Sequence, residues 1–308
     1  MRGGRSGTWT RNSGSLLVAA SLVGATVSPA HAQEGVIERT LEGVGRAIEG
    51  ALARVAGGWN QSVERYDAAA WQEAPDFRWS GRIPAGGSLE IKGVNGAISA
   101  EPAGGAEAVV TTQVRARRSD PRSVRIEVVE HDGGVTLCAV YPSPERAREN
   151  VCAPGTEGRM NTNRNDVEVA FRVLVPAGTP FVARTVNGGI EALDMAGDVR
   201  AVTVNGDVEV TTTASAEAET VNGSIEVAMG GSPAARGLSF STVNGSIRLD
   251  IPDDMDAELD ARWLNGDLES DLPIMLSGRM GRRSARGALG EGGPLLEIST
   301  VNGSIRIR

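Results

Sequence analysis

The chain has 308 residues and a formal net charge of −8, so its surface is acidic and a nucleic-acid partner is not expected. It contains 40 glycines and only 4% aromatic residues, a composition that is typical of turn-rich β-structure. Two cysteines and two histidines supply too few ligands for a transition-metal site, and no cofactor is expected.

Residues 1–32 have the three parts of a secretory signal peptide. Three arginines form a basic leader, an apolar run extends from Leu16 to Val27, and Ala30-His31-Ala32 provides the cleavage site. The apolar run is shorter than the roughly 20 residues that span a bilayer. We therefore expect an exported protein of the periplasm, cell surface or exterior, and not an integral membrane protein. Cleavage removes three arginines and no acids, which changes the net charge from −8 to −11.

Residues 33–75 are expected to form an N-terminal helical segment, because apolar residues recur there at spacings of three and four. These residues share one helical face: Ile37, Leu41, Val44, Ile48, Leu52 and Val55. The opposite face carries both signs of charge, which favours a helix that caps a β-domain over one that docks on a partner or lies on an anionic membrane.

Residues 76–308 are expected to form a single β-domain, because the pattern changes to period two at about Asp76. A turn is predicted at His131-Asp132-Gly133-Gly134, and a long polar loop at 142–166. Cys138 and Cys152 are the only cysteines, and in an exported chain the pair is expected to form a disulfide.

A short motif, Thr-Val-Asn-Gly-(Ser/Asp)-(Ile/Val), recurs through this region. Its seven Asn-Gly pairs are Asn95-Gly96, Asn187-Gly188, Asn205-Gly206, Asn222-Gly223, Asn244-Gly245, Asn265-Gly266 and Asn302-Gly303. From Asn187 onward most copies are about 20 residues apart, which indicates a repeat architecture. The spacing of 37 before Asn302 is interpreted as two periods with one degenerate copy.

Two geometries fit this motif. In an antiparallel hairpin meander, Asn-Gly forms each two-residue turn, but the apolar residue before Asn then points outward in every copy. In a β-solenoid, similar to a parallel β-helix, the chain runs extended through Asn-Gly. The preceding valine is then buried, and the Thr, Asn and Ser/Asp side chains point outward in columns. The side-chain parity favours the solenoid and leaves the meander as the alternative.

The region from about Arg78 to Arg308 resembles the bacterial putative-adhesin β-strand-repeat family, formally a domain of unknown function. The resemblance is carried by the seven Asn-Gly copies, by Val173-Leu174-Val175-Pro176-Ala177-Gly178 and by Gly292-Gly293-Pro294-Leu295-Leu296-Glu297-Ile298. Gly93 and Trp263 depart from it, because other copies have Thr there. The resemblance implies a β-repeat fold in an envelope or extracellular setting and no established activity.

Few residues point to catalysis. His131 lies in a predicted turn without a nucleophile motif, and no phosphate- or dinucleotide-binding glycine pattern occurs. We therefore expect a non-catalytic, adhesin-like binding or structural module that contacts an envelope component, glycan or protein. A polysaccharide lyase or hydrolase on a β-helix is the alternative. The candidate contact residues are the arginines of a glycine-rich loop: Arg279, Arg282, Arg283 and Arg286.

Overall fold

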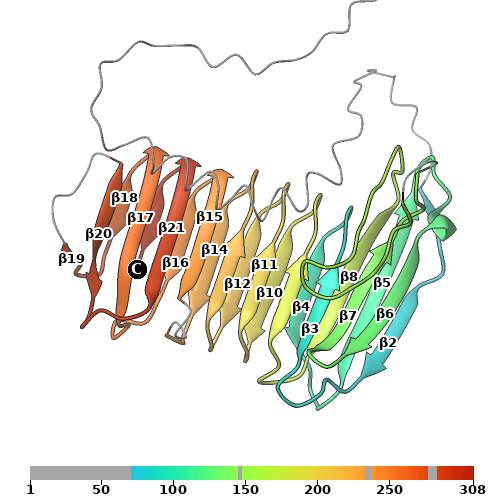
Figure 1. Ribbon diagram of the computed structural model, residues 1–308, viewed down its shortest axis with the longest axis horizontal. Coiled ribbons are helices and arrows are strands. Elements are labelled where there is room, and N and C mark those ends of the chain that lie inside the picture. The colour runs from blue at the N-terminus through green and yellow to red at the C-terminus, as the bar shows by residue number, and fades with distance from the viewer. Residues whose placement is uncertain (1–70, 145–147, 233–236, 277–282) are drawn as a thin grey trace, which may run out of the picture.

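The computed structural model describes residues 71–144, 148–232, 237–276 and 283–308 (Figure 1). The predicted signal peptide and the helix predicted at 35–56 lie outside these residues. The helical element described is a single 3-10 turn, η1 (Pro121–Ser123). Within the described ranges, no helix combines the length and hydropathy that a membrane crossing requires.

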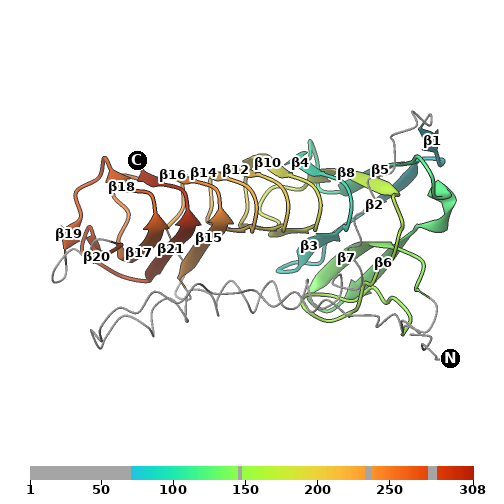
Figure 2. The same ribbon diagram turned by 90° about the horizontal axis from the view of Figure 1, so that it is seen from above.

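Two sheets of 11 strands each lie face to face along the long axis of the molecule (Figures 1 and 2). In spatial order, sheet A contains β1 (Gln72–Glu73), β5 (Ala108–Ala116), β8 (Glu168–Val175), β4 (Ile98–Pro102), β10 (Ile190–Met195), β12 (Val208–Thr212), β14 (Ile225–Met229), β16 (Ile247–Asp250), β22 (Ile305–Ile307) and β18 (Leu268–Ser270), with β2 (Phe77–Gly81) paired to β5. Sheet B contains β19 (Met275–Leu276), β20 (Ser284–Leu289), β17 (Ala257–Asn265), β21 (Leu295–Asn302), β15 (Leu238–Asn244), β13 (Ala216–Glu219), β11 (Val199–Val202), β9 (Phe181–Arg184), β3 (Ser88–Lys92), β7 (Gly134–Val140) and β6 (Arg125–His131).

Each repeat forms one flattened coil. The chain runs along a strand of sheet B, turns at Asn-Gly, and continues along a strand of sheet A. Neighbouring coils pair in parallel in both sheets, as β9 does with β11 and β10 with β12. The predicted β-solenoid is therefore confirmed for the repeats, and the hairpin meander is wrong because no pair of strands that flanks an Asn-Gly corner belongs to the same sheet.

The core lies between the two sheets. Phe181 and Phe240 face inward from sheet B, and Ile190 and Ile225 face inward from sheet A, all of them fully buried. Burial of apolar surface at roughly 25 cal/mol per Å² is the main force that holds the two layers together. The residue before Asn is buried or half-buried in each coil, as the solenoid parity predicted.

The predicted direction of the threonines is wrong. Thr203, Thr220 and Thr242 are each 1% exposed, because the chain bends at Asn-Gly instead of running extended through it. The bend interrupts the in–out alternation, so Ser241 and Thr242 are both buried although they are consecutive. The motif is therefore the corner between two sheets.

An antiparallel cap covers the N-terminal end of the stack. Strand β5 pairs antiparallel with β8, and β6 forms a hairpin with β7 at the predicted His131–Gly134 turn. Strand β1 lies within the last residues of the segment predicted at 33–75 and pairs antiparallel with β5.

The C-terminal coils do not follow chain order. Strand β21 lies between β15 and β17 (Figure 1). Strand β22 lies between β16 and β18. The interpretation of the 37-residue spacing as a degenerate coil is wrong. After β18 the chain instead forms β19 and β20, which pair antiparallel with each other, and β20 pairs antiparallel with β17. Strands β21 and β22 then place the last coil inside the stack.

Candidate functional site: the Asn-Gly corner and the loops around it

The seven motif asparagines form one continuous hydrogen-bonded ladder along the corner. In six of them, all except Asn95, the side-chain Nδ2 donates to the Oδ1 of a neighbouring asparagine at 2.7–2.8 Å. In spatial order the ladder contains Asn95, Asn187, Asn205, Asn222, Asn244, Asn302 and Asn265. Because every bond has the same polarity, the ladder is directional, and the chain's last asparagine is its sixth member rather than its seventh.

The motif glycine is required by close approach between coils. A Cβ on Gly223 would lie 2.0 Å from the carbonyl oxygen of Gly206, and one on Gly245 would lie 1.9 Å from that of Gly223. Any side chain at these positions would force neighbouring coils apart, so the requirement is steric in these copies.

The motif threonine satisfies the glycine carbonyl of the adjacent coil. Thr220 Oγ1 donates to Gly206 O at 3.0 Å, and Thr242 Oγ1 donates to Gly223 O at 2.8 Å. Five threonines make this contact: Thr185, Thr203, Thr220, Thr242 and Thr300. The buried hydroxyls therefore have partners, as polar groups in a protein interior require.

The Ser or Asp after Asn-Gly accepts a backbone hydrogen bond from the next coil. Asp207 Oδ1 accepts from Ser224 N at 2.7 Å, and Ser246 Oγ accepts from Ser304 N at 3.2 Å. Four motif positions thus make contacts between coils. The polar side chains of the motif therefore bond mainly to neighbouring coils of the stack.

The two ends of the ladder differ. At the first end, Asn95 Nδ2 donates to the backbone oxygens of Asn165 and Val167, both at 3.4 Å. The Tyr141 hydroxyl donates to Val167 O at 2.8 Å, and burial raises the pKa of this phenol well above its usual value. At the other end, Asn265 Oδ1 has no donor among the described residues.

Asp166 binds the turn at residues 117–119, which follows β5 in the antiparallel cap. Its carboxylate accepts from the N–H groups of Arg117, Arg118 and Ser119 at 2.8–3.2 Å. Partial burial opposes ionisation of Asp166, but these hydrogen bonds outweigh it and lower the pKa of the carboxyl. The ionised form is therefore the one that stabilises the turn.

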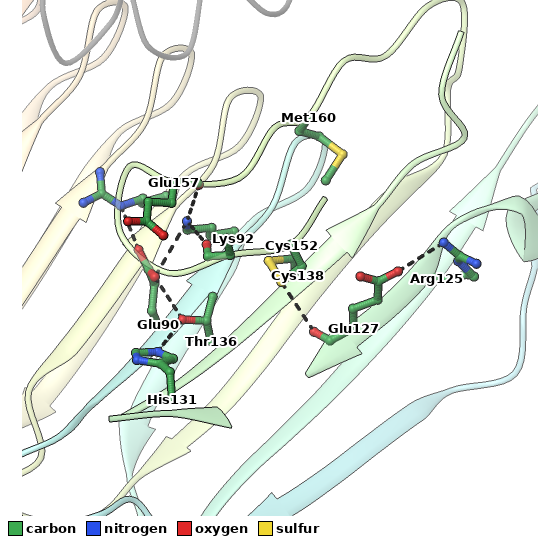
Figure 3. Close-up of a disulfide and its surroundings, with 12 residues drawn as sticks. Glu90, Lys92, Arg125, Glu127, His131, Thr136, Cys138, Cys152, Glu157 and Met160 are labelled. Atoms are coloured by element: carbon green, nitrogen blue, oxygen red, sulfur yellow. Dashed lines mark hydrogen bonds and ion pairs between the residues drawn. A yellow bond between two sulfur atoms is a disulfide. The ribbon is translucent and has the colours of Figure 1, made fainter. Parts of the chain in front are cut away.

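The predicted disulfide joins Cys138 on β7 to Cys152 in the polar loop, with a Cα–Cα distance of 5.7 Å (Figure 3). Beside it, Lys92 Nζ donates to the carbonyl oxygens of Ala153 and Gly155, the second at 2.6 Å. The loop is thus fixed to sheet B covalently and by the ammonium group of Lys92.

Glu90 organises the charges next to this loop. Its side chain, 6% exposed, pairs with Arg184 at 3.1 Å and accepts from Gly155 N at 2.8 Å. Thr136 Oγ1 donates to the same carboxylate at 3.1 Å (Figure 3). Glu90 therefore has the partners that a buried carboxylate needs. No motif or spacing in the sequence predicted this network.

His131 is engaged on both sides of its ring. Gly133 N donates to Nδ1 at 3.1 Å, and Nε2 lies 3.0 Å from Thr136 Oγ1 (Figure 3). Because Nδ1 accepts, we assign the proton to Nε2. These contacts give the ring a structural role in the β6–β7 hairpin.

The structure describes two of the four candidate arginines. Arg279 and Arg282 lie outside the described residues. Arg283 is exposed beside β20, and Arg286 lies on β20 with its Nε 3.2 Å from Asp260 Oδ2. Residues 284–289, predicted as part of a loop, are therefore a strand.

A groove of about 560 Å³ lies on sheet A at the strand ends remote from the Asn-Gly corner. Its lining includes two carboxylates, Asp194 and Asp250, together with Thr211 and Met229. Asp194 has φ 56°, a conformation that non-glycine residues seldom adopt, and its N–H donates to Thr211 Oγ1 at 2.6 Å.

The coils with their Asn, Gly and Thr contacts define the region that can be compared with known families. Residues 187–308 match the family model of Toastrack DUF4097. The predicted resemblance to an adhesin-like domain of unknown function is confirmed for this region. The Asn95 coil precedes the Toastrack match but belongs to the same ladder.

Solved structures that resemble the chain include two from bacteria. One is a putative cell adhesion protein from Clostridium sporogenes, with 10% identity, a TM-score of 0.36, and coverage of 77% of this chain and 99% of that one. The other is a putative adhesin from Bacteroides fragilis, with 12% identity, a TM-score of 0.33, and coverage of 76% and 97%. No curated protein matches the chain.

Proposed function

We propose that this protein is an exported, non-catalytic module of the cell envelope that presents the outer faces of its solenoid to a glycan or protein component. The observation that carries the proposal is the asparagine ladder, which joins seven coils into one elongated block. A block of this kind suits spacing or surface contact. The disulfide supports export, because oxidising compartments outside the cytosol favour such bonds.

The engagement of the polar motif residues supports a non-catalytic role. Thr, Asn and Ser/Asp bond to adjacent coils, and both nitrogens of His131 have partners. The carbohydrate-active alternative depends on the groove that contains Asp194 and Asp250, since glycoside hydrolysis commonly uses a carboxylate pair.

The C-terminal end is the proposed contact end. The outer row of sheet A runs from Glu191, Glu209 and Glu226 through Arg248 and Arg306 to Glu269. In sheet B at this end, Arg283 and Arg286 are exposed at β20, and Arg279 and Arg282 precede them in the sequence. An acidic glycan or an acidic protein surface would complement these arginines.

A glycan and envelope-component binding screen tests this proposal. Deleting residues 279–290 would damage the fold, because it would remove β20, which pairs with β17 at six register positions. The variant is therefore Arg279→Gln/Arg282→Gln/Arg283→Gln. Its matched control neutralises three arginines elsewhere: Arg78, Arg122 and Arg148.

We expect the wild type and the control to bind the same component and the loop variant to bind at least tenfold more weakly. Equal binding by the loop variant would remove the loop from the proposal. Failure of the wild type to bind any component would refute a binding role. Turnover of a polysaccharide that Asp194→Asn or Asp250→Asn abolishes would establish the enzyme instead.

A further inference from the structure

The last coil of the chain occupies a slot inside the stack. The C-terminal coil, residues 294–308, contains β21 and β22. One wall of the slot is the coil of β15 and β16, and the other is the coil of β17 and β18 (Figure 1). These two walls follow each other in sequence, so the C-terminal coil separates coils that the chain makes consecutively.

Both walls hold the insert in one register. Leu296 is paired with Leu238 on one side and with Leu259 on the other, and Asn302 is paired with Asn244 and Asn265. Both walls of the slot therefore pair with the same residues of the C-terminal coil.

The contacts across the slot are specific to this segment. Asn302 Nδ2 donates to Asn244 Oδ1, and Asn265 Nδ2 donates to Asn302 Oδ1, both at 2.7 Å. Two ion pairs join the insert to its second wall: Arg306 with Glu269 at 3.5 Å, and Glu297 with Arg262 at 2.9 Å. A foreign segment would need to supply the corner motif and both charges at once.

A short glycine-rich strap connects the insert to β20. Gly290, Gly292 and Gly293 have φ values of 56°, 80° and 156°, and Pro294 follows them. The strap is held by Asp256, whose Oδ1 accepts from Glu291 N at 2.7 Å. Five residues from 290 to 294 reach at most about 17 Å when extended, which is enough to cross to a neighbouring molecule.

We infer that the slot is an interaction site for the C-terminal coil of a second copy of this chain, so that two molecules join by exchanging residues 294–308. The same segment from another copy makes every contact that the chain's own segment makes. Exchange of identical elements costs little once the strap has opened, because all native pairings are restored. The partner is thus a second copy, selected by the corner motif and the two ion pairs.

The experiment uses the full-length protein in two distinguishable forms, one tagged and one isotopically labelled. Equal amounts are mixed, exposed briefly to urea at the unfolding midpoint, diluted, and examined by native mass spectrometry. We expect dimers that contain one copy of each form. A mixture that contains only monomers and unmixed species over a range of protein concentrations would overturn the proposal.

A pair of disulfide variants tests whether the slot is the site of exchange. Ser246→Cys/Ser304→Cys ties the insert to its own slot, whereas Ser224→Cys/Ser246→Cys ties together two coils that remain joined in sequence. In each pair one residue's N–H donates to the other's hydroxyl, at 3.2 Å and 3.3 Å, and strands about 4.8 Å apart suit a disulfide.

Under oxidising conditions we expect the first variant to lose mixed dimers at least tenfold and the second to keep them. Reduction should restore mixed dimers in the first variant, which excludes misfolding as the cause of their loss. Mixed dimers at equal yield in both oxidised variants would show that another surface makes them and would refute the exchange.

Discussion

The position of an asparagine in the ladder should determine how much its loss costs. Asn222 is an interior member, since it donates to Asn205 Oδ1 and accepts from Asn244 Nδ2, both at 2.8 Å. Asn265 is the end member and makes the single ladder bond to Asn302. Replacement by alanine therefore removes two bonds at one position and one bond at the other. Neither asparagine has a positive φ, so alanine adds no backbone strain at either corner.

The expected magnitudes follow from this count. A net contribution of about 1 kcal/mol per hydrogen bond gives a loss of about 2 kcal/mol for Asn222→Ala and about 1 kcal/mol for Asn265→Ala. Both side chains are exposed, so water takes the place of the missing partner and no buried polar group is left unsatisfied. The assay is urea-induced unfolding at neutral pH, monitored by circular dichroism. The two variants can be compared when the slope of the free energy of unfolding against urea concentration is the same in both. Equal losses in the two variants, or a larger loss at Asn265, would refute the reasoning that the ladder stabilises the stack through its individual bonds.

Three further predictions follow from other contacts. Gly223→Ala places a Cβ 2.0 Å from Gly206 O and should lower the free energy of unfolding by about 3 kcal/mol, whereas Gly104→Ala, with nothing within 4 Å, should change it little in the same urea assay. Cys138→Ser/Cys152→Ser opens a loop with a sequence separation of 14 and should cost about 3 kcal/mol, a loss that dithiothreitol should reproduce in the wild type but not increase in the variant. Because the pKa of Asp166 is lowered in the folded state, its contribution to the free energy of unfolding is present above the carboxyl's unfolded pKa and is lost as pH falls through the folded pKa. Asp166→Asn should therefore make the free energy of unfolding fall less steeply toward acid pH. Urea titrations between about pH 2 and pH 6 that show the same fall in the variant and the wild type would contradict the assignment.

Local patterns in the sequence predict the solenoid because each coil repeats the same inward-facing residues. Ile225 and Val227 are buried on sheet A as the parity after Asn required, and the cysteines pair as the compartment argument predicted. Parity counted through Asn-Gly gave the wrong direction for Thr242. Alternation holds within β15, where Thr242 faces inward with Phe240, and fails where the chain bends from one sheet to the other.

Longer-range features gave weaker signals in the sequence. The ion pair between Glu90 and Arg184 joins residues 94 apart, and neither residue lies in a recurrent pattern. The spacing of 37 between Asn265 and Asn302 is compatible both with a missing coil and with an excursion that returns. A repeat period gives the length of each coil but not the order in which the coils stack. The position of the last coil inside the stack is therefore seen only in the structure.

The insertion of the C-terminal coil also determines which strand is left at the open edge of sheet A. Among the described strands, β18 pairs with β22 alone. This edge strand has three residues and is lined by acids, with Asp267, Glu269 and Asp271 all exposed. Short strands with charged side chains discourage further edge-to-edge pairing.

Stacking in chain order would instead leave β22 at the edge, with Ile305 and Ile307 flanking a single arginine. Such an edge would lack the acidic side chains of β18 and would resemble the repeats that already pair with one another. In sheet B at the same end of the stack, β20 pairs antiparallel with β17, so a parallel repeat coil cannot pair with β17 there. The order of the last two coils therefore limits growth at the end of the solenoid. Association through exchange of the C-terminal coil would still join two molecules, because it uses the slot inside the stack and leaves the acidic edge exposed.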